Sequence, residues 1–337
     1  MINQTANFFG KAGLPWMVPI VRLIGRDDPR EQAKEILLQI GVPFLAFAAF
    51  LAIWSVLAAG VQTSLGAIPG PKQVIEQGRT LFVEHASERE KAAQFHERQK
   101  KRVAEALAED PKADTKIRPW TGKPTYIDQI VTSLFTVFTG FALATLVAVP
   151  LGILCGLSRT FQIALNPLIQ IFKPVSPLAW LPIVTLVVSA VYVSADPMFQ
   201  KSFITSAITV TLCSMWPTLI NTAVGVASVD KDLVNVSKVL RLSTFTKVRK
   251  IVVPSSLKFI FTGLRLSLGV GWMVLIAAEM LAQNPGLGKF VWDEFQNGSS
   301  DSLARLMVAV LTIGIIGFLL DRVMHTLQSL LDFGARR

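Results

Sequence analysis

Polar side chains that can bind an anion gather in one apolar stretch of the sequence, TLCSMWPTLINT, at 211–222. Their hydroxyl, amide and indole groups donate hydrogen bonds, and such donors can replace water around a negative ion. Pro217 interrupts the stretch and would free backbone groups inside a helix. The candidate lining residues here are Ser214, Trp216, Thr218, Asn221 and Thr222. The structural alternative is that Pro217 only kinks a helix.

Ionisable and indole side chains in neighbouring apolar stretches extend this candidate path. An ionisable residue inside a membrane span is a candidate functional residue. The additional candidates are Lys173, Trp180, Arg265, Trp272 and Glu279. A positive residue would add attraction for an anion. Alternatively, Glu279 pairs with a neighbouring helix, while Lys173 and Arg265 extend to the lipid headgroups.

Residue groups typical of catalysis are missing from the sequence. The histidines His85, His96 and His325 form no HExxH or other metal-ligand pattern. Cys155 and Cys213 lie in apolar stretches, where free cysteine behaves as a small hydrophobe. The fragment NPGLGKF lacks the first glycine and the hydroxyl residue of a phosphate-binding loop. We therefore predict no catalytic residue, metal site or nucleotide site in this chain.

The composition predicts that the candidate path lies in a membrane protein. The chain has 337 residues, of which 51% are hydrophobic and 17% are charged. Its mean hydropathy of +0.49 is far above the value for a soluble domain. The formal net charge is +10, but the basic residues cluster beside apolar runs, which favours cytoplasmic loops over nucleic-acid binding. The N-terminus shows no cleavage pattern of a removed signal peptide.

Six membrane spans are expected to position these side chains. Because a span needs about 20 mostly apolar residues, four uncharged stretches qualify, at 36–71, 129–158, 174–195 and 202–229. Two shorter stretches, 266–278 and 306–320, are bounded by charges that can reach the interface. Six spans place both termini on one side, where basic residues concentrate at 22–34, 223–258 and 336–337. That side is predicted to be cytoplasmic.

These spans divide the chain into five segments. We expect a cytoplasmic or interfacial segment at 1–35, a first transmembrane helix at 36–61, an extracytoplasmic insertion at 62–125, a transmembrane core at 126–325 and a cytoplasmic tail at 326–337. Within the insertion, the residues at 84–110 have the Ala, Glu, Lys and Arg content of an exposed helix, and the chain then returns irregularly to the membrane. They form either a docking surface for an external partner or a solvated insertion.

A basic segment separates two of the apolar runs: NVSKVLRLSTFTKVRKIVVPSS, at 235–256, has five Lys or Arg and no acidic residue. Ser237, Ser243 and Thr244 are possible helix starts and Pro254 is a helix breaker, so we expect two short helices that meet at a bend. Such helices can bind in a groove on a soluble partner. Alternatively, the positive charge only anchors the loop in the cytoplasm.

This loop resembles the coupling loop of ABC importer permeases, whose pattern runs from Glu-Ala-Ala through a glycine to an apolar residue and a Leu-Pro pair. The corresponding positions are Asn235-Val236-Ser237, Arg241, Ile251 and Val253-Pro254. The resemblance implies that the loop at 230–258 contacts an ATPase through Asn235, Val236, Ser237, Lys238, Arg241, Ser243, Lys247 and Pro254. With Arg241 in the glycine place, either the turn is made without a glycine-only conformation or the loop geometry differs.

Other segments are similar to the nitrate, sulfonate, taurine and bicarbonate branch of these permeases. They include SLFTVFTGFALATLVAVPLGILCGLS, NPLIQIFKPVSPLAWLPIVTL and TGLRLSLGVGWMVLIAAEML, and the similarity covers roughly 126–330. The phrases AAEML and GKFVWDEFQNGSS are closest to nitrate/nitrite permease subunits. The insertion around 84–122 departs from the shorter members.

The resemblance implies an all-α, polytopic protein with the type I ABC importer permease fold, in a bacterial inner membrane with both termini cytoplasmic. Its implied partners are a second copy of the chain as a homodimer, cytoplasmic ABC ATPases that bind ATP and Mg²⁺, and an extracytoplasmic binding protein. The chain itself would hold no cofactor. Nitrate or nitrite is the expected substrate, and bicarbonate, cyanate, taurine and alkanesulfonates are alternatives. An ion-driven carrier or channel, or a membrane enzyme, would not need this loop.

Overall fold

The computed structural model describes residues 16–25, 28–63, 66–109, 120–193 and 198–334. Within these ranges the regular structure is helical, apart from an antiparallel hairpin of β1 (Gln62–Thr63) and β2 (Gly66–Ala67). Part of the expected N-terminal segment, part of the insertion and the basic tail residues Arg336 and Arg337 lie outside the described residues.

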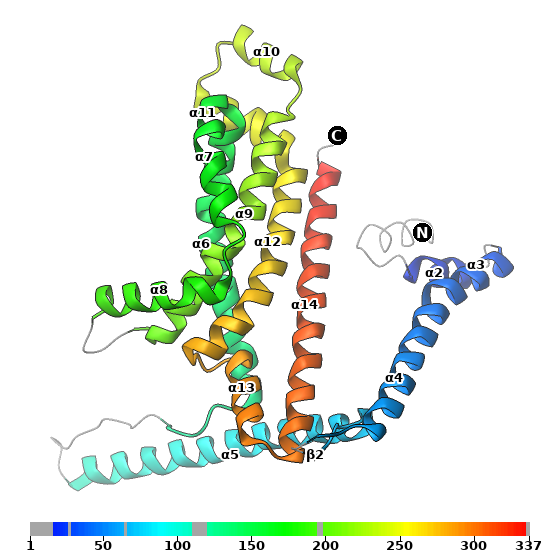
Figure 1. Cartoon of the computed structure of the whole chain (residues 1–337), viewed down its shortest axis with the longest axis vertical. Coiled ribbons are helices and arrows are strands. Elements are labelled where there is room, and N and C mark those ends of the chain that lie inside the picture. Colours follow the sequence, from blue (N-terminus) through cyan, green and yellow to red (C-terminus); the bar gives the residue numbers. More distant parts are fainter. Residues whose placement is uncertain (1–15, 26–27, 64–65, 110–119, 194–197, 335–337) are drawn as a thin grey trace.

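The N-terminal elements lead into one isolated apolar helix (Figure 1). α2 (Met17–Ile24), α3 (Pro29–Ile36) and the π-turn η1 (Leu37–Gly41) precede α4 (Val42–Gly60). Most side chains of α4 are apolar and exposed, so this helix requires cover from lipid or from another protein. The hairpin follows, and α5 (Pro71–Glu109) then runs across the end of the helical bundle.

The bundle is built around α9. Its long helices are α6 (Tyr126–Leu157), α9 (Lys201–Ala227), α12 (Val253–Ala282) and α14 (Ser300–Gly334). α9 packs between α6 and α12. After α6, α7 (Arg159–Phe172) runs back beside it and α8 (Pro177–Val191) turns away at 101°. A short helix, α13 (Leu287–Asn297), connects α12 to α14.

Small residues at every fourth position of α6 allow it to approach α9 closely. They are Gly140, Ala144, Ala148, Gly152 and Gly156. A Cβ atom on Gly152 would lie 2.7 Å from the carbonyl oxygen of Leu219 and 2.6 Å from the Cβ of Thr222. This spacing of small residues is typical of close helix pairs in membranes. Any side chain at Gly152 would therefore force α6 and α9 apart.

An adjoining face of α9 meets a second small-residue series on α12, formed by Gly263, Ser267 and Gly271. Pro217 lies inside α9 and removes a helical hydrogen bond there. The backbone N–H of the next residue, Thr218, donates to the Ser267 hydroxyl at 3.1 Å. The two hydroxyl groups are also hydrogen-bonded at 2.7 Å. The polar groups beside the proline therefore hold α9 against α12.

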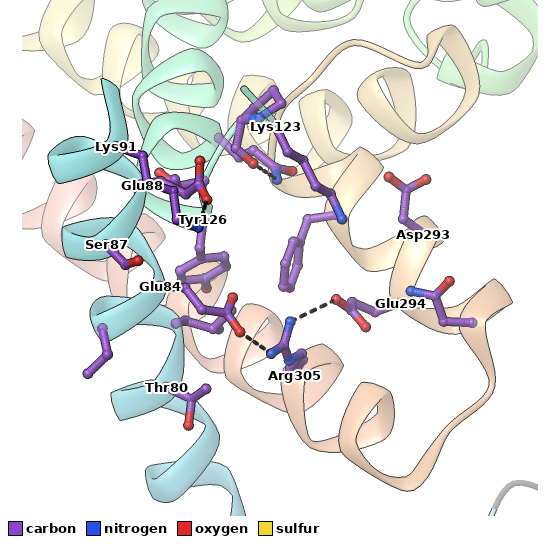
Figure 2. Close-up of a pocket in the computed structure, with 17 residues that line it drawn as sticks. Thr80, Glu84, Ser87, Glu88, Lys91, Lys123, Tyr126, Asp293, Glu294 and Arg305 are labelled. Carbon is purple, nitrogen blue, oxygen red and sulfur yellow. Dashed lines mark hydrogen bonds and ion pairs between the residues drawn. The ribbon is translucent and has the colours of Figure 1, made fainter. Parts of the chain in front are cut away.

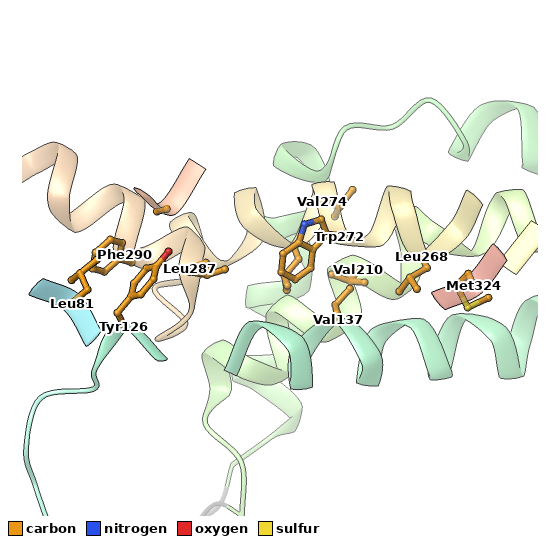
Figure 3. Packing of buried hydrophobic residues seen from close by; sticks show 12 residues of the cluster. Leu81, Tyr126, Val137, Val210, Leu268, Trp272, Val274, Leu287, Phe290 and Met324 are labelled. Carbon is orange, nitrogen blue, oxygen red and sulfur yellow. The ribbon is translucent and has the colours of Figure 1, made fainter. Parts of the chain in front are cut away.

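Buried apolar side chains run along the bundle and reach α5 at its end (Figure 3). The central part of this cluster includes Val137, Val210, Leu268, Trp272 and Met324. At the end nearest α5, Leu81 packs with Tyr126, Leu287 and Phe290, and the Tyr126 and Phe290 ring centroids are 4.8 Å apart. Because Leu81 is 2% exposed, the first half of α5 is part of the core.

In the described part of the chain, five helices are long and apolar enough to cross a membrane, and the bent pair α7–α8 would make a sixth. The uncharged stretch 36–71 is not one helix, because α4 ends at Gly60 and α5 begins at Pro71. α8 has 15 residues, too few to span alone. The expected span at 174–195 is therefore replaced by a bent pair, whose first member the sequence reading missed.

The two short apolar stretches at 266–278 and 306–320 belong to the much longer helices α12 and α14. The charges that were expected to mark their ends, Arg265 and Asp321, instead lie within these helices and pair with each other. At one end of the bundle lie the loop after α9 and the end of α14, while α5, α13 and β2 lie at the other (Figure 1).

Candidate coupling loop and transport path

The loop between α9 and α12 contains two short helices, but the first begins before the basic segment. α10 (Lys231–Val239) begins after Asp230, whose side chain accepts a hydrogen bond from the N–H of Asp232 at 2.9 Å. Ser237 therefore lies inside α10, and the expectation that it starts a helix is wrong. α11 (Thr244–Lys247) begins after Ser243, whose hydroxyl accepts from the N–H of Thr246 at 3.3 Å. The loop projects beyond the bundle (Figure 1).

Pro254 does not break a helix, contrary to the prediction. It lies in the first turn of α12, and α11, the π-turn η2 (Val248–Val252) and α12 are contiguous. A proline ring clashes with the carbonyl four residues earlier in a regular α-helix. Here the wider π-turn lies immediately before it, in the place where that conflict would arise. The loop is therefore joined to Ala282 by one helical segment.

Arg241 adopts the left-handed conformation that favours glycine, with φ of 47°. It follows the end of α10, where its N–H donates to the Lys238 carbonyl at 3.0 Å and the N–H of Leu242 donates to the Ser237 carbonyl at 3.0 Å. These two bonds form the Schellman motif, which places a left-handed residue just after a helix. The expectation of a turn without this conformation is wrong, since Arg241 adopts it.

Arg241→Gly is expected to raise the free energy of unfolding by about 1 kcal/mol, because a side chain in the left-handed region costs about 1–2 kcal/mol and glycine loses part of this gain through backbone entropy. The measurement is thermal or detergent unfolding of the purified subunit. Arg241→Ala is the control, since it removes the charge but keeps a Cβ. An equal gain from both variants would assign the effect to charge rather than to backbone strain.

The predicted loop residues occupy different environments. Asn235 and Val236 line a shallow hollow with Asp232, Val239 and Leu240. A second hollow is lined partly by Lys238, Arg241 and Lys247. Ser237 is buried, and its hydroxyl donates to the Val234 carbonyl at 2.6 Å, so it stabilises α10 internally.

The sequence reading missed three apolar side chains on this loop. Val239, Leu240 and Phe245 are 82%, 63% and 74% exposed at the far end of the bundle. Apolar side chains of this size on a projecting loop are typical of an interaction site. The sequence did not indicate their exposure, because apolar residues in an amphipathic segment usually face the core of their own protein.

Several predicted path residues on α9 hold the helix against its neighbours. Thr218 is bonded to Ser267, and the Asn221 amide donates to the Pro217 carbonyl at 2.8 Å. Ser214 and Thr222 are fully buried beside the close glycine contacts of α12 and α6. Within the described residues, the buried polar atoms of Trp180, Ser214, Trp216 and Thr222 have no hydrogen-bond partner.

Lys173 and Trp180 lie together at the bend between α7 and α8. Lys173 is the exposed residue that follows α7, and the Trp180 ring lies 5.7 Å from the Phe172 ring. On α12, the Trp272 indole donates to the Ile313 carbonyl of α14 at 3.0 Å. Trp272 is therefore a packing residue between two helices in this chain.

Arg265 is paired with a carboxylate of the neighbouring helix. Its Nε and Nη2 atoms donate to the two carboxylate oxygens of Asp321 on α14 at 2.5 Å and 2.8 Å. The pair lines a groove between α12 and α14 with Thr262, Gly269 and Met273. A two-point pair of this kind fixes the register of the two helices.

Asp321→Ala is expected to destabilise the chain by about 1 kcal/mol, because the side chains of the Arg265–Asp321 pair are 36% and 45% exposed and exposed ion pairs contribute up to about 1 kcal/mol. The exchange Arg265→Asp with Asp321→Arg should restore most of the loss. Unfolding and uptake are measured on the same variants. If the exchanged pair recovers stability but not uptake, Arg265 has a role in transport besides its pairing.

Glu279 is fully buried where α6, α12 and α13 meet. Its Oε2 accepts hydrogen bonds from the Ser133 hydroxyl at 2.7 Å and from the Gly288 N–H at 3.0 Å. Its Oε1 accepts from the Asn284 amide at 3.4 Å, and the N–H of Leu287 donates to the Ser133 hydroxyl at 2.8 Å. The carboxylate therefore holds the start of α13 against both long helices.

Two glycines make room for this carboxylate. A Cβ on Gly286 would overlap the Glu279 carboxylate, and a Cβ on Gly288 would overlap the Ile276 carbonyl and lie 2.8 Å from the Glu279 Cβ. The fragment NPGLG is therefore explained by close packing around Glu279. The ten predicted path residues are distributed over the α7–α8 bend, the α9 contacts and three separate positions on α12.

A cavity of about 410 Å³ lies at the opposite end from the loop, between α5 and α13 (Figure 2). Arg305 of α14 projects into it and pairs with Glu84 of α5, and it lies 3.8 Å from Glu294 of α13. Lys123 and Asp293 also line the cavity. Ion pairs of Arg305 with acidic residues therefore connect α14 to α5 and α13 at this end of the bundle.

Residues 148–337 match the protein family described as "Binding-protein-dependent transport system inner membrane component". The chain belongs to this family. It is therefore a multi-pass membrane permease subunit, a transport component rather than an enzyme. The family description also names the inner membrane and a binding protein as parts of such systems.

Two curated permease proteins are similar to this permease subunit over most of its length. It is 34% identical over 288 residues to the nitrate import permease protein NrtB of Synechocystis sp., covering 86% of this chain and 88% of that protein. It is 38% identical over 207 residues to the bicarbonate transport system permease protein CmpB of Synechocystis sp., covering 61% and 69%.

A chain of the inward-facing MetNI methionine ABC transporter matches with a TM-score of 0.52 and 12% identity, covering 61% of this permease and 95% of that chain. At this identity the likeness shows the fold alone. It confirms the predicted fold class, an all-α membrane protein with the ABC importer permease fold.

Proposed function

We propose that this permease subunit belongs to an ATP-driven importer of a small inorganic oxyanion, with nitrate or nitrite as the substrate. The observation that carries the proposal is the similarity to a nitrate import permease, which extends over 86% of this chain. Bicarbonate is the second candidate, because a bicarbonate permease is 38% identical over a shorter part of the chain.

The loop at 230–258 is the proposed contact with cytoplasmic ATPase subunits, which would bind ATP and Mg²⁺. Its support is the projection of α10 and α11 beyond the bundle and the exposed apolar residues Val239, Leu240 and Phe245. Apolar anchors bordered by basic residues fit recognition of short helices in a groove. This assignment makes the loop end of the bundle cytoplasmic, together with both termini.

A second copy of the chain is the proposed partner within the membrane. Its support is α4, a helix of the described chain whose apolar side chains are exposed almost throughout. The substrate would pass beside the bundle core of the two copies. The unpartnered indole N–H groups of Trp180 and Trp216 are the side chains that best support such a path, because both are hydrogen-bond donors.

The proposal is tested by reconstitution of the subunit with its ATPase and binding protein in proteoliposomes. We expect ATP-dependent accumulation of labelled nitrate that stops when the ATPase is inactivated. Accumulation of bicarbonate but not nitrate would select the second candidate. Uptake that persists without ATP hydrolysis would contradict both and favour an ion-driven carrier.

A further inference from the structure

The middle of α5 contacts the start of α6. The His85 ring nitrogen and the Thr125 hydroxyl are 2.6 Å apart, and Arg89 pairs with Asp128. Thr125 is the N-cap of α6 and Asp128 lies in its first turn. Since the apolar part of this span follows directly, the middle of α5 lies at the depth where the span enters the membrane.

One face of α5 continues from the bundle into the second half of the helix. In the first half, Val74 and Leu81 are buried on the bundle, and His85 contacts the start of α6. At helical spacing the same face then carries a series of half-buried residues, Ala92, Phe95, Gln99, Val103 and Ala106, of which all but Gln99 are apolar. In Figure 1 this second half extends sideways past the ends of α6 and α13.

The residues around this series are those of an interfacial helix. Phe95 contacts Trp120, with ring centroids 5.1 Å apart, and tryptophan is enriched at the membrane boundary. Lys100 and Arg102 are exposed and border the apolar series on its two sides, while Lys101 lies on the opposite face. An apolar face bordered by basic residues is typical of helices that lie on a membrane.

We propose that the second half of α5, at 92–109, rests on the outer leaflet, which is the side opposite the proposed cytoplasmic loop. Val103 and Ala106 face the lipid beside the Phe95–Trp120 contact, and Lys100 and Arg102 bind lipid phosphate groups. The direction follows from the first half, because the face that meets the outer end of the bundle turns toward the membrane beside it. The insertion is then a membrane-surface support rather than a docking surface for a protein.

The test uses spin labels on the full-length chain, with Cys155 and Cys213 replaced by alanine. Val103→Cys and Ala106→Cys carry the label on the proposed lipid face, and Lys101→Cys is the matched control on the opposite face. The chain is reconstituted in vesicles of phosphatidylethanolamine and phosphatidylglycerol. Collision with molecular oxygen, which concentrates in lipid, is compared with collision with a water-soluble nickel complex.

We expect oxygen to relax the labels at 103 and 106 more than nickel does, and the reverse at 101. Equal access of nickel to all three positions would place the helix in water and overturn the proposal. Exclusion of both reagents at 103 and 106 would also overturn it, because a protein would then cover this face.

A second pair of variants tests the basic border. Lys100→Glu with Arg102→Glu is expected to raise nickel access at position 106, since Lys and Arg near an anionic surface contribute to membrane binding. Lys101→Glu on the far face should leave this access unchanged. The same rise from both variants would contradict specific contacts by Lys100 and Arg102.

Discussion

Replacing Glu279 by alanine is expected to lower the free energy of unfolding by about 3–5 kcal/mol, the largest effect among the predicted stability changes. The change would leave the Ser133 hydroxyl, the Gly288 N–H and the Asn284 amide without their acceptor inside the protein. Each of these donors is buried, so water cannot replace the lost hydrogen bonds without a free-energy cost. The measurement is detergent unfolding of the purified subunit.

Glu279→Gln tests how much of the stability loss comes from each hydrogen bond of the Glu279 carboxylate. A glutamine can keep its oxygen in the Oε2 place, where Ser133 and Gly288 donate. Its amide would then face the Asn284 amide, two donors against each other. We therefore expect a smaller loss of about 1–2 kcal/mol, an assembled complex and impaired uptake, because the position of α13 is disturbed.

Asp293→Ala is the control for loss of a carboxylate on the adjoining helix. Asp293 pairs with Lys289 within α13, and its side chain is 43% exposed. Such surface pairs contribute less than about 1 kcal/mol. If Glu279→Ala proved no more destabilising than Asp293→Ala, Glu279 would not anchor α13.

Val239→Asp is expected to weaken association with the ATPase subunits by roughly 30-fold, equivalent to about 2 kcal/mol for an apolar anchor residue. Because Val239 is 82% exposed, its replacement should not alter the fold of the subunit alone. The measurement is binding of purified ATPase to the subunit in nanodiscs, together with ATP-dependent uptake.

Val83→Asp supplies the matched control at the other end of the bundle. Val83 is also exposed, at 67%, but lies on α5. We expect this variant to bind the ATPase as the unchanged chain does. Equal loss from both variants would show that an added carboxylate weakens the assembly in general, and the loop would lose its proposed role.

The membrane class and the second short helix of the loop were predictable because both depend on local patterns. Long apolar runs define spans, and Ser243 caps a helix that begins at the next residue. The bend between α7 and α8 was not predictable in this way. The expected third span began at the bend and so combined α8 with the chain after it, while α7, with polar residues of its own, was missed.

At the candidate site, the contacts between residues far apart in the sequence could not be predicted. Arg265 and Asp321 are separated by 56 residues and Ser133 and Glu279 by 146, and no local spacing shows that they meet. Sequence reasoning could identify Glu279 as unusual, because it interrupts an apolar run. It could not show that Gly286 and Gly288 leave space for its carboxylate.

The continuous helical segment at 244–282 connects the loop to the opposite end of the bundle. It has 39 residues, which at 1.5 Å per residue is a rod of about 58 Å. A rigid tilt of about 5° at the loop would move the far end by about 5 Å. Since Glu279 holds α13 at that far end, a movement of the loop proposed to bind the ATPase would shift α13 at the other end of the bundle.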